Sequence, residues 1–289
     1  MASSHFDELT KALAASTSRR QTIKVLFASA LGSTLGFEGI GAVQAEGNCD
    51  QSPSTDLCGN PTDNFGIWHD KIKGCVHSPG TCTGEVDPSH TPPQWVLLHE
   101  DNKPNYTLFA GQRRKGIECP KILRMNAPNY WEFAWDAAKK HLKGQVKAGK
   151  IGLAINSRAA RTECQLHIHV SCIQTGVRTK LDGYYKSGHI APNPASWNSK
   201  KYVRPLKYTV NGSSQTRTFR LLYLKNLNQN LFQLLHDKVV VPNGEDMAQQ
   251  TLVVTEGPKE GFYILNSMDP SSSFVGTGFG EGLLDETCS

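Results

Sequence analysis

The chain has 289 residues, 38% of them hydrophobic and 20% charged, with 31 Lys and Arg against 26 Asp and Glu for a net charge of +5. This composition is typical of a globular protein and excludes a disordered, collagen-like or coiled-coil chain, because apolar residues are plentiful and no repeat is present. The net charge is too small to indicate a nucleic-acid-binding protein. Eight cysteines, none in a Cys-x-x-Cys pair, indicate disulfides that form after export.

The first 45 residues have the features of an export signal. A polar leader ends near Arg19-Arg20, and the apolar run that follows over 25–37 is too short to span a membrane as a helix. Small residues at Val43 and Ala45 predict cleavage before Glu46. The adjacent arginines favour a twin-arginine signal over an ordinary secretory signal or an uncleaved anchor, so we expect a periplasmic or otherwise extracytoplasmic protein.

Residues 46–93 are rich in Gly, Pro, Ser, Thr and Asp, and they hold four of the cysteines. Because such a segment has little apolar surface to bury, we expect cross-links to tie it to the rest of the protein. Cys75 and Cys82 flank a Pro-Gly turn and are the preferred local pair. The catalytic or binding domain is expected over residues 94–289.

Regular structure is predicted from residue 94 onward. Strand-forming residues at 95–99 and 106–110 flank a set of turn residues and predict a hairpin. Apolar residues at helical spacing predict a helix from Tyr130 to Leu142, with Asn129 as its N-cap and Gly144 or Gly149 at its end. A strand is expected at 151–156. Further strands are predicted at 202–208, 219–224, 252–255 and 261–265, and a second helix at 227–237. This order favours an α+β fold with a mostly antiparallel sheet.

The sequence Gln-Leu-His-Ile-His-Val-Ser at 165–171 carries the strongest chemical signal. Alternate side chains of a strand face opposite sides, so one face of this strand is apolar and the other carries Gln165, His167, His169 and Ser171. The two imidazoles are about 6.6 Å apart along the strand. A polar row of this kind is costly to bury unless a ligand or partner uses it.

The loop before this strand supplies further polar groups: Asn156, Ser157, Arg158, Arg161 and Thr162. Guanidinium groups match phosphate oxygens in charge and geometry. One use of such a site is zinc binding, although zinc needs a third protein ligand and no Asp or Glu lies on this face of the strand. Another is attack on phosphorus by a neutral imidazole. A third interpretation is that both histidines simply have satisfied hydrogen bonds.

Residues 165–170 resemble the histidine-triad signature His-φ-His-φ-His-φ, with Gln165 in place of the first histidine. The wider block 153–173 is similar to the corresponding block of bacterial CDP-diacylglycerol pyrophosphatases, a histidine-triad-like family. A block of this length is more specific than an isolated His-x-His. The resemblance runs from about Cys75 to the C-terminus, with outlying matches at 116–118, 131–135, 177–182 and 285–288.

This resemblance implies a histidine-triad-like fold and hydrolysis of the diphosphate of CDP-diacylglycerol to CMP and phosphatidate. His167 matches the central histidine of the triad, which implies that it is the nucleophile toward the cytidine-side phosphate. His169 matches the third and implies contact with the phosphates or the leaving group. The substrate-binding residues implied are Asn156, Ser157, Arg158, Arg161, Thr162, Gln165 and Ser171. No metal or other cofactor is implied.

One stretch departs from the family pattern. Residues 199–205 contain lysine where histidine is expected and Pro205 where arginine is expected, which leaves lipid and nucleotide selectivity open. A basic cluster in and after this stretch is either a solvated face or a contact with an anionic head group or membrane surface. Its members are Lys200, Lys201, Arg204 and Lys207.

The resemblance also bears on the cysteines. Two of them lie in family-like blocks, which implies the bond Cys172–Cys288, and we further expect the bonds Cys49–Cys58 and Cys119–Cys164. Cys164 and Cys172 would be about 26 Å apart along an extended strand, so these two cannot bond to each other.

Two other functions stay open. One is a histidine-triad-like hydrolase or transferase that acts on a soluble nucleotide diphosphate such as a nucleotide sugar. The other is a non-catalytic exported module whose histidines bind zinc or another ligand.

Overall fold

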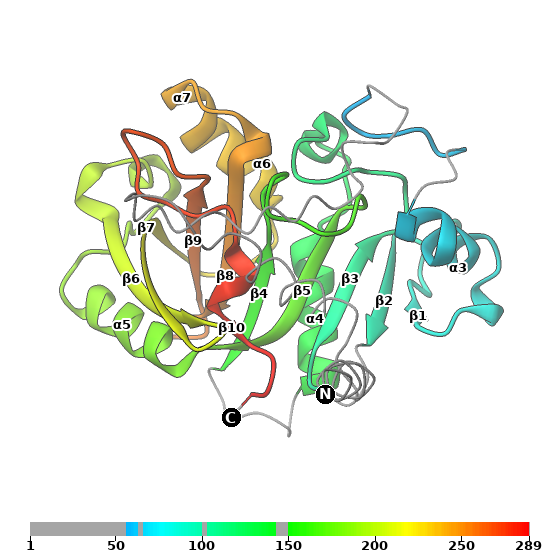
Figure 1. Ribbon diagram of the computed structural model, residues 1–289, viewed down its shortest axis with the longest axis horizontal. Helices are drawn as coiled ribbons and strands as arrows, with labels where there is room; N and C mark the ends of the chain where they lie inside the picture. The colour runs from blue at the N-terminus through cyan, green and yellow to red at the C-terminus, as the bar shows by residue number, and fades with distance from the viewer. Residues whose placement is uncertain (1–55, 63–65, 100–102, 143–149, 289) are drawn as a thin grey trace, which may run out of the picture. The chain divides into compact units, whose positions relative to one another are not determined.

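The computed structural model describes residues 56–62, 66–99, 103–142 and 150–288 (Figure 1). All of them belong to one compact unit, Ala45–Ser289. The predicted export signal with its cleavage site, Cys49 and the predicted helix ends at Gly144 and Gly149 lie outside the described residues. No helix in the described ranges is long and apolar enough to cross a membrane.

The described residues form a mixed structure of helices and strands, as the α+β prediction requires. The strands are β1 Glu85–Val86, β2 Trp95–His99, β3 Tyr106–Ala110, β4 Ile151–Ile155, β5 His167–Ile173, β6 Val203–Val210, β7 Ser213–Leu224, β8 Gln250–Glu256, β9 Phe262–Met268 and β10 Leu284–Asp285. The α-helices are α3 Lys73–His77, α4 Tyr130–Leu142, α5 Thr175–Lys186, α6 Leu231–Leu235 and α7 Val241–Asn243. Short 3-10 or π segments include η1 Trp68–Ile72, η3 Pro120–Leu123, η5 Lys200–Tyr202, η6 His236–Val240 and η8 Gly280–Leu283.

The strands form a single antiparallel sheet in the described part of the chain, in the order β1-β2-β3-β5-β4-β8-β9-β7-β6. The strand with the two histidines, β5, lies between β3 and β4, near the middle of the sheet. β10 pairs with the far end of β5, where Asp285 lies opposite Cys172. The C-terminus is therefore attached to the strand that carries the proposed chemistry.

Each face of the sheet buries its own apolar clusters. On one face Ile168 and Val170 of β5 pack with Trp131 and Ala134 of α4 in the largest cluster. On the other face α5 and η8 cover the half formed by β6 to β9. A third cluster joins η1 and α3 to β2 and β3 on this second face, at the opposite end of the sheet.

Most predicted strands are confirmed; the two hairpin strands keep their predicted bounds, β4 ends one residue earlier, and β7 and β8 are longer than predicted. The 95–99 and 106–110 hairpin pairs residue for residue, from Trp95 opposite Ala110 to His99 opposite Tyr106. The histidine strand begins at His167 rather than Gln165. Every residue of β5 is buried, so the polar face is enclosed as fully as the apolar one.

The predicted helices agree less completely with the structure than the predicted strands do. The helix at Tyr130–Leu142 is confirmed, but the side chain of Asn129 does not cap it: its Oδ1 accepts no hydrogen bond from the described residues, and its Nδ2 donates to the carbonyl of Leu227 and to Glu132. The predicted helix at 227–237 begins later, because Asn230 accepts from the backbone N–H groups of Phe232 and Gln233 and starts α6 at Leu231. Helix α5 was not predicted.

The segment before residue 94 buries more than its composition suggests. Trp68, Ile72 and Val76 are buried against Val96 and Phe109 of the first hairpin. Since aromatic and branched side chains here cover one end of the sheet, the segment is packed onto the fold as well as cross-linked to it.

The disulfides confirm two predicted pairs and correct the others. Cys75–Cys82 and Cys172–Cys288 form as predicted. Cys58 bonds to Cys119, with 4.6 Å between the Cα atoms, so the predicted pairs Cys49–Cys58 and Cys119–Cys164 are wrong. Cys164 is also disulfide-bonded. Disulfides of this number are typical of a protein that matures in an oxidising compartment.

Candidate active site

Four loops meet at the edge of the sheet where β3 and β4 end and β5 and β8 begin. Backbone hydrogen bonds join them: Leu166 N donates to Arg114 O at 2.7 Å, Arg158 N to Ala248 O at 2.8 Å, and Ser157 N to Gly278 O at 2.8 Å. The polar residues that the sequence singled out before β5 therefore lie beside a loop from the C-terminal part of the chain.

The two histidines occupy the gap between the apolar clusters of the second face. Phe109, opposite His167, belongs to the η1–α3 cluster, and Ala154, opposite His169, belongs to the α5–η8 cluster. The imidazoles meet edge to face, with 4.9 Å between ring centroids. His167 is 3% exposed and His169 1%. Apolar side chains on both sides thus keep the histidine pair away from bulk water and strengthen the electrostatic interactions there.

A hydrogen bond fixes the tautomer of His167. Its Nδ1 lies 2.7 Å from the carbonyl oxygen of Gln165. A carbonyl oxygen can only accept, so Nδ1 carries the proton, and in the neutral ring Nε2 carries the lone pair. The arrangement gives His167 a nucleophilic nitrogen without the help of a separate base.

A carboxylate that the sequence did not reveal approaches His169. Glu281 Oε2 lies 3.3 Å from His169 Nε2. Asn156 holds Glu281 from two sides: its Nδ2 donates to Glu281 Oε2 at 3.1 Å, and its Oδ1 accepts from the backbone N–H of Glu281 at 3.0 Å. Asn156, predicted to cradle phosphate, is brought to the site but is engaged with a neighbouring side chain.

The loop that delivers Glu281 depends on close packing against Ser157. Ser157 Oγ donates to Asp269 Oδ1 at 2.8 Å, and a Cβ on Gly278 would collide with both side chains. Only glycine fits there. Burial raises the pKa of Asp269, while the bond from Ser157 opposes the rise. The glycines at 276, 278, 280 and 282 are the one sequence signal for this close approach.

Arg161 lies in the loop before β5, but its guanidinium binds a carboxylate of the protein. Its Nη1 and Nη2 bind Glu118 Oε2 and Oε1 at 2.5 and 2.7 Å, and both side chains are almost fully buried. A Cβ on Gly116 would collide with this guanidinium. The pair joins the loop after β3 to the loop before β5, and so fixes the entry to the histidine strand.

Lys115 adds a cation that the sequence did not single out. It is buried, and burial lowers its pKa, with the nearby charges of Arg113 and Arg158 lowering it further. Arg158 itself is exposed, as is Thr162. Positive charge held this close together favours an anionic ligand.

The remaining predicted site residues, Gln165 and Ser171, bind backbone carbonyl groups. Gln165 is buried; its Nε2 donates to the carbonyls of Ala110 and Gln112 at 2.7 Å, and its Oε1 accepts from Arg113. Ser171 Oγ donates to Pro104 O and Asp285 O at the far end of β5. The site thus brings together His167, His169, Asn156, Ser157, Arg158 and Arg161, with Thr162 exposed on the same loop and Ser171 at the other end.

The described residues contain no group of three or more His, Cys, Asp or Glu side chains placed to hold a metal ion.

Comparisons with known proteins identify the family of the chain. A family model described as CDP-diacylglycerol pyrophosphatase matches residues 72–289, which include every site residue named above. The chain is also 31% identical over 217 residues to a CDP-diacylglycerol pyrophosphatase of Yersinia pestis, a match that covers 71% of this chain and 78% of the relative. The chain therefore belongs to the CDP-diacylglycerol pyrophosphatase family and is a phosphoric anhydride hydrolase.

Proposed function

We propose that this chain hydrolyses CDP-diacylglycerol through a nucleotidyl intermediate on His167. The observation that carries the proposal is the 2.7 Å contact between His167 Nδ1 and the carbonyl of Gln165, which places the lone pair of the neutral ring on Nε2. The His169 imidazole lies 4.9 Å from the His167 ring between centroids. The likeness to the histidine triad supports the same role for His167 and stays a prediction.

The reaction has two displacements at one phosphorus atom. His167 Nε2 attacks the cytidine-side phosphorus, a P–N bond forms, and the P–O bond to phosphatidate breaks with its electron pair on the leaving oxygen. Water then attacks the same phosphorus, and the P–N electron pair returns to Nε2. The products are CMP and phosphatidate. Splitting the reaction in this way replaces one difficult step by two easier ones.

Cationic side chains of the loops are proposed to bind the diphosphate. Arg158 and Thr162 are exposed at the site, and Lys115 lies within the same group of charges. Arg161, Ser157 and Gln165 are engaged with Glu118, Asp269 and backbone carbonyls, so we assign them to holding the loops in place. Fixed positive charge in an enclosed site stabilises the developing charge on phosphoryl oxygens.

The purified chain is expected to release CMP and phosphatidate in equal amounts from CDP-diacylglycerol, and to keep this activity after exhaustive chelation. Turnover that is lost on chelation and restored by zinc would favour the zinc site instead. Faster turnover of a nucleotide sugar than of the lipid would favour the soluble-substrate alternative. A catalytically inert protein that binds zinc would support the non-catalytic module.

Contact with a lipid surface is proposed at the edge of the sheet that holds the active site. The exposed large hydrophobic side chains of the described residues are Leu57, Met125, Val241 and Val275. Leu57 adjoins Cys58, which bonds to Cys119, Met125 follows η3 after Cys119, and Val241 begins α7; Figure 1 shows α7 and residues 56–62 along the upper rim. Export through a twin-arginine signal, as predicted, would bring the protein to the outer side of a membrane.

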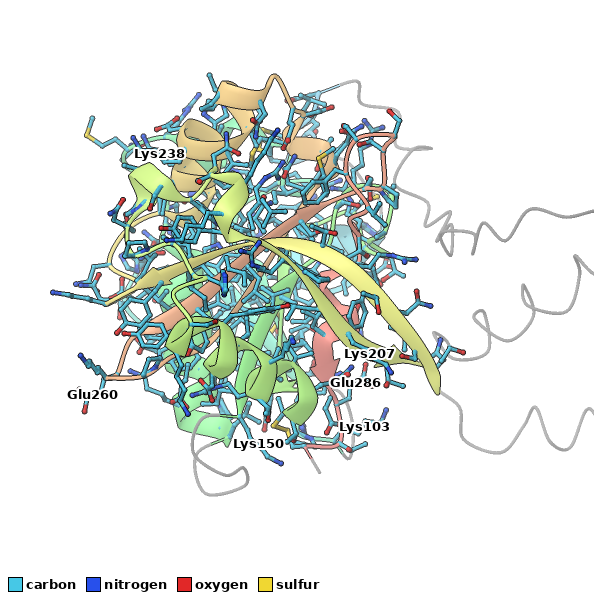
Figure 2. The ribbon with its side chains drawn as sticks, turned by 90° about the vertical axis from the view of Figure 1, so that its left-hand side faces the viewer. Lys103, Lys150, Lys207, Lys238, Glu260 and Glu286 are labelled. Carbon is cyan, nitrogen blue, oxygen red and sulfur yellow. A yellow bond between two sulfur atoms is a disulfide. The ribbon has the colours of Figure 1, made fainter. Side chains whose placement is uncertain are left out.

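The basic cluster of Lys200, Lys201, Arg204 and Lys207 does not lie wholly at that edge. Figure 2 shows Lys207 at the lower end of the unit with Lys103, Lys150 and Glu286, whereas Lys238 is at the upper end. Lys150 directly precedes β4, so the lower end is the edge away from His167. We therefore place the lipid contact at the upper edge.

Replacing Met125, which is 98% exposed, by Asp is expected to weaken sedimentation with vesicles of phosphatidylcholine and phosphatidylglycerol about tenfold, because a buried methionine contributes roughly 1.5–3 kcal/mol. Hydrolysis of CDP-diacylglycerol in detergent micelles should be unchanged. Equal sedimentation of both proteins would place the contact elsewhere.

A further inference from the structure

We propose that Glu281 and His169 act as a proton-transfer pair that activates water for the second displacement. The inference deepens the proposed function and rests on it. It assigns a positioning role to a residue of the C-terminal segment that lies 112 positions beyond His169 in the chain.

The Glu281 carboxylate is fixed by neighbouring groups, unlike a carboxylate on the protein surface. Its side chain is 14% exposed, and its Oε2 lies 3.3 Å from His169 Nε2. Asn156 binds both its carboxylate and its backbone N–H. Gly278 and the Ser157–Asp269 bond fix the path of the loop just before it. Side-chain and backbone contacts from two other segments thus set the position of this one carboxylate.

The negative charge of Glu281, 3.3 Å from His169 Nε2, favours one tautomer of His169. A carboxylate accepts and does not donate, so it favours the proton on the facing nitrogen, Nε2. The lone pair of the neutral ring is then on Nδ1. This is the same logic by which a buried carboxylate orients the histidine of a catalytic triad. The ring lies edge to face with His167, at 4.9 Å between centroids, so it is beside the imidazole that would carry the nucleotidyl group.

The proton balance of the reaction indicates that Glu281 and His169 act chiefly in the second displacement. Phosphatidate leaves as a phosphate monoester, a weakly basic group that needs little help from an acid. Water is a poor nucleophile and must lose a proton as it attacks. His169 Nδ1 takes that proton, the oxygen of the water bonds to phosphorus, and the imidazolium formed is stabilised by Glu281. Release of the proton to solvent resets the pair.

Glu281→Gln tests the pair with little change of shape. Glu281 Oε2 is the oxygen that meets both Asn156 Nδ2 and His169 Nε2, so an amide that keeps the Asn156 bond still presents an oxygen to His169 but lacks the negative charge that would stabilise the imidazolium. We expect phosphatidate to appear in a burst equal to the enzyme concentration, with CMP release slowed by on the order of 10²-fold. The slow step should leave the nucleotidyl group on His167. Glu281→Asp should recover part of the CMP release.

Glu286→Gln is the matched control, because it makes the same chemical change in the same segment at a half-exposed ion pair with Lys103. It should behave as the wild type. Asn156→Ala keeps the Glu281 side chain but removes the hydrogen bonds that position it, so less of the nucleotidyl intermediate should accumulate than in Glu281→Gln. This variant replaces Glu281→Gln as the test if Glu281→Gln does not fold. Unchanged kinetics, or equal slowing of both products without a burst, would overturn the inference. Absence of any nucleotidyl intermediate in the wild type would instead overturn the proposed function.

Discussion

His167→Ala is expected to lower kcat for CMP release from CDP-diacylglycerol by on the order of 10⁴-fold or more, because the variant has no atom to form the P–N bond. The second histidine and the cationic loop can still bind the substrate, so KM should change much less than kcat. His167→Gln should lose as much activity while keeping a polar side chain opposite Phe109. The measurement is the steady-state rate of CMP release at several substrate concentrations.

An exposed histidine provides the control for this variant. His77 lies at the end of α3, where its ring contacts the carbonyl of Lys73, and His77→Ala should retain wild-type kinetics. Melting temperatures of all three proteins should show that the folds are intact. Substantial turnover by folded His167→Ala would rule out this residue as the nucleophile.

Removing Glu118 is expected to destabilise the fold by about 3–5 kcal/mol, because Arg161 would be left as a buried charge without its carboxylate. The two side chains are 3% and 4% exposed and share two hydrogen bonds. Glu118→Ala should therefore unfold at markedly lower denaturant concentration, as followed by circular dichroism. Because the pair also joins two loops of the site, the remaining folded protein should be less active.

Asp136 offers a matched comparison on the surface. Its pair with Lys139 is more than half exposed at both side chains, and exposed pairs of this kind contribute about 0.2–1 kcal/mol. Asp136→Ala should hardly shift the unfolding midpoint. If Glu118→Ala and Asp136→Ala have similar effects, the Glu118–Arg161 pair does not stabilise the loops as described.

The parts of the site that follow from local periodicity could be predicted from the sequence. Side chains alternate along a strand, so His167 and His169 had to share a face, and the structure confirms that they lie ring against ring. Residues immediately before the strand had to lie near its start. The hairpin and helix α4 were also predictable, because turn residues and helical spacing mark them directly.

The missed parts depend on contacts between distant segments. Glu281 reaches His169 only because the chain returns to β5 through η8 and β10, which no pattern within 165–171 reveals. Glu118 and Lys115 similarly come from the loop after β3. Helix α5 was hidden by Gly176 and Gly183, which lower helical propensity, although its apolar residues pack against the sheet. Asn156 by itself resembles a phosphate ligand, because its carboxylate partner Glu281 is 125 positions away in the sequence.

The disulfides likewise divide into one that follows from local sequence and one that depends on distant contacts. Cys75 and Cys82 are close in sequence across a turn, so their bond followed from spacing. The bond between Cys58 and Cys119 spans 61 positions and depends on how residues 56–62 pack against the loop that carries Glu118. Pairing at that separation is set by tertiary structure.

Mapping the covalent intermediate tests the central claim most directly. Wild-type protein mixed with CDP-diacylglycerol, quenched within a single turnover and digested at a pH that preserves phosphohistidine should carry a CMP group on the peptide that contains His167, attached through Nε2. The same group should be absent from His167→Ala. A nucleotidyl group on another residue, or full turnover with no covalent intermediate, would contradict the account.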